Sequence, residues 1–323
     1  MNTLLDVRGL TVTLPTNSGP MTIVDGVDYA VEQGQVFGVA GESGSGKTIS
    51  VLALMQLLPA GAKTSGVARY DGQDLLTLRA RALRDVRGAQ LGMVFQDPLT
   101  SLHPMLSIGK QLTEHVRSHE GASRSAAAKR AVDLLEEVRI PDPERALHGF
   151  PHQFSGGMRQ RIAIAIALAA RPKLLIADEP TTALDVTVQA GILRLLDRLR
   201  RENGLSVILI THDLGVMSSI ADEVAIFYAG RIVESGPTRE LLTSPRHPYT
   251  RALLDALPHP EAEGTELVAI PGSPPTPRAR PAGCAFHPRC PYASEQSRTE
   301  VPPLVSISET RLLACHVDPF WTA

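Results

Sequence analysis

The feature that most constrains this chain is the segment Gly41-Glu-Ser-Gly-Ser-Gly-Lys-Thr48. It fits the phosphate-binding loop pattern G-x-x-x-x-G-K-[ST], in which backbone N–H groups curve around phosphate oxygens. Such a loop needs an apolar strand before it and a helix after it, and Gln35–Ala40 and Lys47–Leu58, ended by Pro59, predict both. We therefore expect a bound nucleotide to contact Gly41, Glu42, Ser43, Gly44, Ser45, Gly46, Lys47 and Thr48.

A second apolar run ends in two carboxylates. Leu174–Ala177 reads as a buried strand, and Asp178 and Glu179 follow it directly. Beside a phosphate loop whose threonine can bind Mg²⁺, Asp178 can hold the Mg²⁺ shell and Glu179 can orient or deprotonate an attacking water. Acidic residues often end strands, so this pattern indicates a nucleoside triphosphatase only together with the loop, and it does not say which kind.

A serine and two glycines open a predicted helix that runs from Met158 to Ala170. Ser155, Gly156 and Gly157 can form a second anion site at a helix start, although a simple helix cap explains the same letters. At Phe154–Met158 the sequence resembles the ABC transporter ATPase family, whose signature is similar to Leu-Ser-Gly-Gly-Gln. Phenylalanine and methionine replace the outer residues here, and the Ser-Gly-Gly core is kept.

Further landmarks of that family occur in the expected order across residues 3–236. Gln96 matches a glutamine that contacts Mg²⁺ and water and senses the membrane partner, and Asp185, in Ala183–Asp185, matches the D-loop. His212 matches the histidine that contacts the γ-phosphate. The resemblance thus implies that Glu179, His212 and Gln96 are catalytic and that Thr48, Gln96 and Asp178 hold Mg²⁺. Leu14 stands where relatives usually stack an aromatic ring on adenine.

The tail resembles the C-terminal extension of the dipeptide, oligopeptide and nickel importer ATPases. Pro245–Thr250 and Gly283–Pro291 carry this resemblance, as does Phe150–Gly157. Many members of that group hold a [4Fe-4S] cluster on four tail cysteines. This chain has Cys284, Cys290 and Cys315, with Ser297 at the fourth place.

The sequence leaves three interpretations of the tail cysteines open. The first is an iron–sulfur cluster, although such clusters normally take four thiolates. The second is a zinc site completed by His287 or His316, and the third is a remnant that packs a small loop module. Because the tail lies outside residues 41–212, we expect changes in it to have little effect on ATP hydrolysis.

These motifs predict an α/β protein with the P-loop ABC ATPase fold. We expect a nucleotide-binding domain over residues 1–236, with an antiparallel β subdomain near its start and a helical subdomain inserted at about 97–170. A C-terminal extension with a small cysteine-containing module should follow over residues 237–323. Seven prolines between Pro258 and Gly283 predict an extended connection into that module.

Composition excludes some kinds of partner. The formal net charge is −2, so no global field favours nucleic acid. The longest apolar run, Ile162–Ala170, is too short to cross a bilayer as a helix, and the first residues do not resemble a secretory signal. We therefore expect a peripheral protein on the cytoplasmic face of the membrane, attached through other subunits.

The family resemblance implies the remaining partners and the activity. It implies ATP and Mg²⁺ as cofactors, a second ABC ATPase subunit (a paralogue or a copy), two membrane permease subunits and a solute-binding protein that acts through them. The implied function is ATP hydrolysis that drives peptide import. Import of nickel or glutathione is the alternative, and two rivals stay open: a soluble ABC ATPase outside transport, and a regulatory module that binds nucleotide without turnover.

Overall fold

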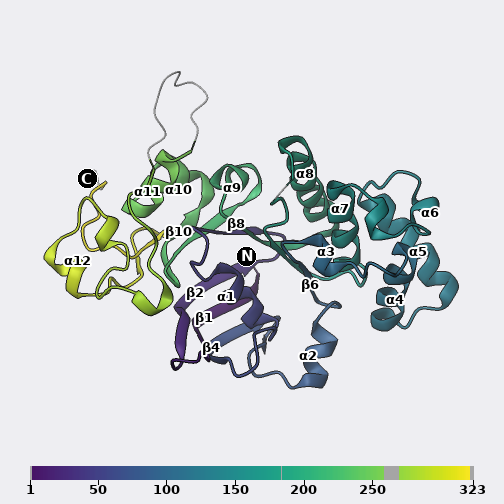
Figure 1. Cartoon of the computed structure of the whole chain (residues 1–323), viewed down its shortest axis with the longest axis horizontal. Coiled ribbons are helices and arrows are strands. Elements are labelled where there is room, and N and C mark those ends of the chain that lie inside the picture. Colours follow the sequence, from purple (N-terminus) through teal and green to yellow (C-terminus); the bar gives the residue numbers. More distant parts are fainter. Residues whose placement is uncertain (1, 183, 258–268, 321–323) are drawn as a thin grey trace. The chain divides into compact units, whose positions relative to one another are not determined.

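The computed structural model describes residues 2–182, 184–257 and 269–320 (Figure 1). Of the sequence predictions, Ala183 in the D-loop and Pro258 and Pro260 in the connection lie outside these residues. The chain divides into two compact units. The first unit is mainly Leu78–Ile210 with the short segment Glu32–Val36, and the second comprises Thr3–Val31, Phe37–Thr77 and Thr211–Ala323.

The first unit combines parallel strands with a long helical stretch. Its strands run in the order β8-β7-β6, with Leu91 opposite Leu174 and Leu174 opposite Ser206. Every residue of β7 and β8 is buried, as expected for parallel strands covered on both faces. Its elements are α2 (Ala80–Val86), β6 (Leu91–Val94), α3 (Pro98–Ser101), α4 (Ile108–Glu120), α5 (Arg124–Glu137), α6 (Pro143–Ala146), η1 (Pro151–Gln153), α7 (Gly156–Ala167), β7 (Leu174–Asp178), α8 (Val186–Asn203) and β8 (Ser206–Thr211).

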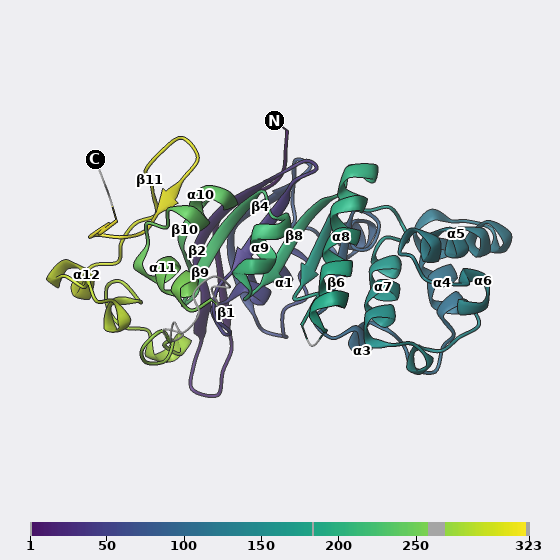
Figure 2. The same cartoon turned by 90° about the horizontal axis from the view of Figure 1, so that it is seen from above.

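Local sequence signals set the ends of the helices in this unit. Ser107 and Ser123 cap α4 and α5 by accepting a backbone N–H bond, and Asp185 does the same for α8. Gly121 and Gly204 end α4 and α8 in the left-handed conformation that glycine adopts easily. Figure 2 shows α4, α5 and α6 gathered together and α7 lying beside α8, and the helices from α3 to α7 all lie within the stretch of about 97–170 that the sequence predicts to be helical.

The second unit contains two sheets and the C-terminal extension. The antiparallel sheet has the order β2-β1-β4-β5, and the other strands run β11-β12-β10-β9-β3, with β3 parallel to β9. Its elements are β1 (Thr3–Leu14), β2 (Met21–Glu32), β3 (Val36–Ala40), α1 (Lys47–Leu54), β4 (Lys63–Tyr70), β5 (Gln73–Asp74), α9 (Leu214–Ile220), β9 (Glu223–Tyr228), β10 (Arg231–Pro237), α10 (Thr238–Thr243), α11 (Pro248–Asp255), η2 (Pro277–Ala279), η3 (His287–Arg289), α12 (Glu295–Thr299), β11 (Val305–Ser306) and β12 (Leu312–Leu313).

The helix after the phosphate loop is shorter than predicted. We expected it to reach Leu58, but α1 ends at Leu54. Gln56 takes a left-handed conformation with φ of +46°, and its side-chain amide donates to the carbonyl of Leu75 at 2.7 Å. The chain therefore leaves the helix through a left-handed residue and not at Pro59.

A buried carboxylate ties the extension to β10. Glu234 is fully buried and accepts a hydrogen bond from the Arg311 guanidinium at 2.5 Å. The backbone N–H groups of Arg246 and His247 donate to the same carboxylate at 2.9 and 3.0 Å. Since a buried charge is costly without partners, these contacts hold the start of α11 and the strand β12 against β10.

None of the helices within the described ranges is long and apolar enough to cross a membrane.

We predict that Glu234→Gln lowers the free energy of unfolding by about 3 kcal/mol, because it leaves the Arg311 guanidinium buried without its counter-charge. The matched control is Asp255→Asn, which breaks the exposed Arg251–Asp255 pair and should cost less than about 0.5 kcal/mol. Urea unfolding of both variants measures the difference. Equal losses would show that the buried pair contributes no more than a surface pair.

Candidate nucleotide site

In the predicted phosphate loop, the Lys47 side chain folds back onto the backbone at the start of the loop. The Lys47 Nζ donates to the carbonyl oxygens of Gly41 at 2.7 Å and Glu42 at 2.9 Å. The N–H of Gly230, just after β9, donates to the Ser45 carbonyl at 2.8 Å, which anchors the loop from outside. Lys47 is buried, so the loop places one buried cation inside a ring of backbone groups.

Two features show that this loop fits a phosphate group. The Ser45 hydroxyl is buried, and among the residues that the structure describes it has no hydrogen-bond partner. Gly46 precedes α1 with φ of +102°, and α1 has no side-chain cap, so its positive end is not covered by a capping carboxylate or hydroxyl. An anion is the usual group at such a helix start.

Gly41 is required by the lack of space around it. Its φ is +142°, and a Cβ there would lie 2.2 Å from the carbonyl oxygen of Phe227 on β9. Gly44 also has a positive φ, of +76°, but a Cβ there would meet nothing within 4 Å. The two glycines therefore serve different needs: close approach to β9 at Gly41, and backbone curvature at Gly44.

The Glu179 carboxylate is held by two neighbours in the first unit. The Gln96 amide donates to Glu179 Oε2 at 3.0 Å, and the Thr182 hydroxyl donates to the same oxygen at 2.9 Å. Glu179 itself has φ of +45°, and its N–H donates to the Ile210 carbonyl at 2.9 Å. Gln96 and Glu179, 83 positions apart in the sequence, are thus in direct contact, and Asp178, next to Glu179 in the chain, is buried.

The Ser-Gly-Gly segment starts α7 next to α8. Ser155 caps α7 by accepting from the Met158 N–H at 3.3 Å. A Cβ on Gly157 would lie 2.5 Å from Val188 Cγ1, whereas one on Gly156 would meet Leu184 at 3.5 Å. Gly157 is therefore needed for the packing of α7 against α8, a constraint that the signature motif does not reveal.

His212 follows β8 in the second unit and is exposed. The next residue, Asp213, caps α9 by accepting from the N–H groups of Gly215 at 2.8 Å and Val216 at 3.2 Å. Asp185 caps α8 in the first unit through the Val188 N–H at 2.9 Å, so it has a structural part besides any role in a D-loop.

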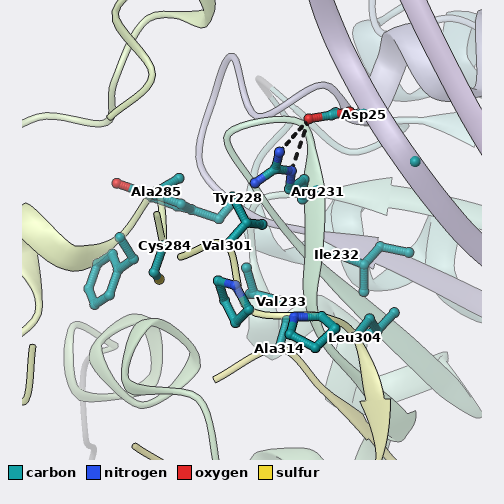
Figure 3. Close-up of a pocket in the computed structure, with 14 residues that line it drawn as sticks. Asp25, Tyr228, Arg231, Ile232, Val233, Cys284, Ala285, Val301, Leu304 and Ala314 are labelled. Atoms are coloured by element: carbon teal, nitrogen blue, oxygen red, sulfur yellow. Dashed lines mark hydrogen bonds and ion pairs between the residues drawn. The ribbon is translucent and has the colours of Figure 1, made fainter. Parts of the chain in front are cut away.

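The three tail cysteines, Cys284, Cys290 and Cys315, are partly buried and form no disulfide bond. Among the residues described, no group of three or more His, Cys, Asp or Glu side chains is placed to hold a metal ion. Cys284 lines a cavity of about 220 Å³ together with Tyr228, Val233 and other, mainly apolar, side chains (Figure 3). Burial raises the pKa of the Cys284 and Cys290 thiols.

The side chains proposed to complete a tail site have other contacts. Ser297 is buried, and its hydroxyl lies 3.0 Å from that of Ser294, the residue that caps α12. A ring nitrogen of His287 lies 3.0 Å from the Cys284 carbonyl, and one of His316 lies 3.0 Å from the Glu300 carbonyl. The iron–sulfur and zinc interpretations therefore gain no support from the side-chain arrangement.

Comparison with known proteins identifies the family. Residues 24–182 match the family described as ABC transporter, and residues 233–296 match the one described as Oligopeptide/dipeptide transporter, C-terminal region. The oligopeptide transport ATP-binding protein OppD of Salmonella typhimurium is 47% identical over 97% of this chain and 93% of its own length. The chain belongs to the ABC transporter family.

Further relatives and a solved structure support the assignment of this chain to the ABC transporter ATPases. OppD of Bacillus subtilis is 49% identical over 95% of this chain and 87% of its own, and the dipeptide transport ATP-binding protein DppD of Escherichia coli is 46% identical over 97% and 96%. The dimeric, post-hydrolysis structure of the ATP-binding cassette MJ0796 bound to ADP and Pi matches with a TM-score of 0.65 and 28% identity, over 73% of this chain and 99% of that one. The predicted ABC ATPase fold, the assignment as an ATPase and the tail resemblance are confirmed.

We predict that Gly41→Ala lowers the melting temperature and abolishes the extra stability that MgATP gives, because its methyl group would collide with the Phe227 carbonyl. Gly44→Ala should cost only about 1 kcal/mol, the strain of a positive φ. Thermal unfolding with and without MgATP distinguishes the two. If the Gly41→Ala protein keeps full stabilisation by MgATP, the close approach of Gly41 to the Phe227 carbonyl does not limit the residue at this position.

Proposed function

We propose that this ABC ATPase hydrolyses ATP to drive the import of peptides across the cytoplasmic membrane. The observation that carries this proposal is the similarity over nearly the whole chain to proteins named for oligopeptide and dipeptide transport, together with the match of residues 233–296 to the oligopeptide/dipeptide C-terminal region. Import of nickel or glutathione is the second candidate, because the tail resemblance includes those importers. A soluble ABC ATPase without a membrane partner has no comparable support.

Lys47 and Glu179 divide the proposed chemistry between binding and catalysis. The curved loop from Gly41 to Thr48 binds the phosphates through backbone N–H groups and Lys47, and Ser45 offers its buried hydroxyl. Glu179 accepts the proton of, or orients, the attacking water, and His212 contacts the γ-phosphate. Gln96 holds the Glu179 carboxylate in place through Oε2.

Thr48, Gln96 and Asp178 are the proposed holders of Mg²⁺. Oxygen donors of these types suit this ion, and when bound it neutralises charge on the phosphate oxygens. The position of Asp178 at the end of β7, directly before Glu179, supports the assignment, because it puts the proposed metal ligand next to the proposed base.

Two ATPase subunits are proposed to share each nucleotide. Ser155, Gly156 and Gly157 of one subunit would face the ATP held by the loop of the other, with Asp185 near the same interface. The exposure of Ser155 at the start of the twelve-residue helix α7 supports this, since such a helix start favours an anion. The second subunit is a copy or a paralogue.

The permease subunits are proposed to dock beside Gln96. Leu99 and Met105 are 54% and 77% exposed, and they lie within the segment just after this glutamine. Exposed apolar side chains of this size commonly mark protein contacts. Docking here would hold the ATPase at the cytoplasmic face of the membrane and link it, through two permeases, to a solute-binding protein.

The proposed division of the chain is a nucleotide-binding domain over residues 1–236, with a helical subdomain at about 97–170, followed by the extension at 237–323. An iron–sulfur cluster on Cys284, Cys290 and Cys315 stays a proposal with only the tail resemblance behind it.

We predict that Glu179→Gln lowers ATP turnover by about 10²–10⁴-fold while ATP binding is kept, because an amide cannot accept the proton. Glutamine can keep the contacts to Gln96 and Thr182, so the fold should not change. Phosphate release and labelled-peptide uptake by the transporter reconstituted in vesicles measure the loss, with the exposed Glu202→Gln on α8 as control. Near-normal release by Glu179→Gln would refute the catalytic assignment.

We predict that Ser155→Arg spares MgATP binding by the isolated chain and abolishes ATP hydrolysis by the assembled transporter. A bulky side chain at the start of α7 would obstruct the phosphate of the partner's nucleotide and not the chain's own. Nucleotide titration of the single subunit and turnover by the complex test both parts. Loss of ATP affinity in the isolated variant would contradict a shared site.

A further inference from the structure

The second residue of the phosphate loop carries a carboxylate that is fixed by the C-terminal tail. Arg289 donates to Glu42 through both arms of its guanidinium, at 2.7 Å to Oε2 and 3.0 Å to Oε1. The Arg289 side chain is 5% exposed and that of Glu42 is 23% exposed. A two-pronged arginine–carboxylate pair with little exposure is the strong form of an ion pair, because both geometry and charge are satisfied.

The surroundings of Arg289 fix its position. It lies in η3, between Cys284 and Cys290, and its Nε donates to the Pro271 carbonyl at 2.9 Å. The guanidinium carbon lies 5.9 Å from the ring centre of Tyr228 and 5.8 Å from that of Phe286. The hydrogen bonds to Glu42 raise the pKa of Arg289 above its ordinary value, so it stays charged.

Glu42 is held a second time through its backbone. The Tyr249 hydroxyl accepts from the Glu42 N–H at 2.8 Å. Tyr249 lies on α11 and is fully buried, and its ring packs 4.5 Å from Tyr228 and 5.3 Å from Phe286, measured between ring centres. Tyr228 of β9, Tyr249 of α11 and Phe286 of the cysteine-containing module thus form one aromatic cluster, and Tyr249 connects this cluster to the phosphate loop. Figure 3 shows Tyr228 on the same cavity as Cys284 and Ala285.

The charge of Glu42 is a problem for a loop that must bind a triphosphate. An unpaired carboxylate in this position would repel the phosphates, and at distances of a few ångströms near a protein surface such repulsion amounts to a few kcal/mol. Lys47 is the loop's own cation, and its Nζ donates to the Glu42 carbonyl oxygen. Neutralisation of Glu42 by Arg289 removes a negative charge that would otherwise oppose the binding of a triphosphate by this loop.

We propose that Arg289, a residue of the C-terminal tail, is a positioning residue for ATP binding: it neutralises Glu42 and turns that carboxylate away from the phosphates. The proposal rests on the proposed role of the loop in binding ATP. It also revises the expectation that the tail has little effect on ATP hydrolysis, because residues 247 positions apart in the sequence meet at the loop.

A double-mutant cycle with MgATP tests this proposal in the reconstituted transporter. Arg289→Met should raise KM for ATP by roughly tenfold, since an unpaired carboxylate would then face the phosphates. The change in kcat should be much smaller, because Glu179 and Gln96 are untouched. In a Glu42→Gln background the same Arg289→Met change should alter KM by less than about twofold, because the carboxylate that would repel the phosphates is already absent.

Two further variants keep the test decisive. Arg289→Lys retains the charge but not the two-pronged geometry, so its KM should lie between those of wild type and Arg289→Met, and it serves in the cycle if the methionine variant does not fold. Arg246→Met is the matched control, because it removes a tail arginine that forms a partly buried ion pair with Asp318. Its KM should equal that of wild type.

The possible outcomes distinguish a failure of the proposed function from a failure of the inference about Arg289. A wild-type transporter that does not bind or hydrolyse MgATP would overturn the proposed function itself. If wild type is active and Arg289→Met raises KM by the same factor with and without the Glu42→Gln change, Arg289 only braces the tail and the inference is wrong. An unchanged KM in Arg289→Met and Arg289→Lys would also refute it.

Discussion

The constraint on which the proposed nucleotide site depends is the tight curve of the backbone over Gly41–Thr48, a loop that holds Lys47 buried and that we propose binds a phosphate group. Backbone groups do this only where side chains leave room, and Gly41 lies so close to the Phe227 carbonyl that a Cβ cannot be added. The strand β9, the turn at Gly230 and the start of α1 all serve this curve. The positive helix end and the buried lysine then act in the same direction on a phosphate.

Glu179 shows a similar use of an uncommon backbone conformation. Glu179 follows directly after β7, whose five residues are all buried, and its positive φ changes the course of the backbone at the end of the strand. Gln96 and Thr182 then fix one oxygen and hold the side chain in one direction. For the proposed catalytic role of Glu179, a carboxylate restrained in this way would lose little conformational entropy on binding a water beside a phosphate.

The sequence predicted those parts of the molecule in which neighbouring residues decide the structure. The apolar runs that end at Ala40 and Ala177 became β3 and most of β7, and the serine before two glycines became the cap of α7. It did not predict the early end of α1, because the left-handed Gln56 depends on a bond to the distant Leu75 carbonyl. Nor did it predict the pairing of Glu42 with Arg289, since no local pattern records which cation folds back onto a loop.

The burial of Glu234 determines whether the C-terminal extension could be removed from this chain. Residues after Gly236 look like an added tail in the sequence, yet they supply all of the hydrogen-bond donors described above for this carboxylate. A shortened gene product would keep the negative charge inside the sheet and lose the groups that solvate it. Loss of the tail in evolution would therefore require a simultaneous change at position 234, which links the history of the extension to one residue of the core.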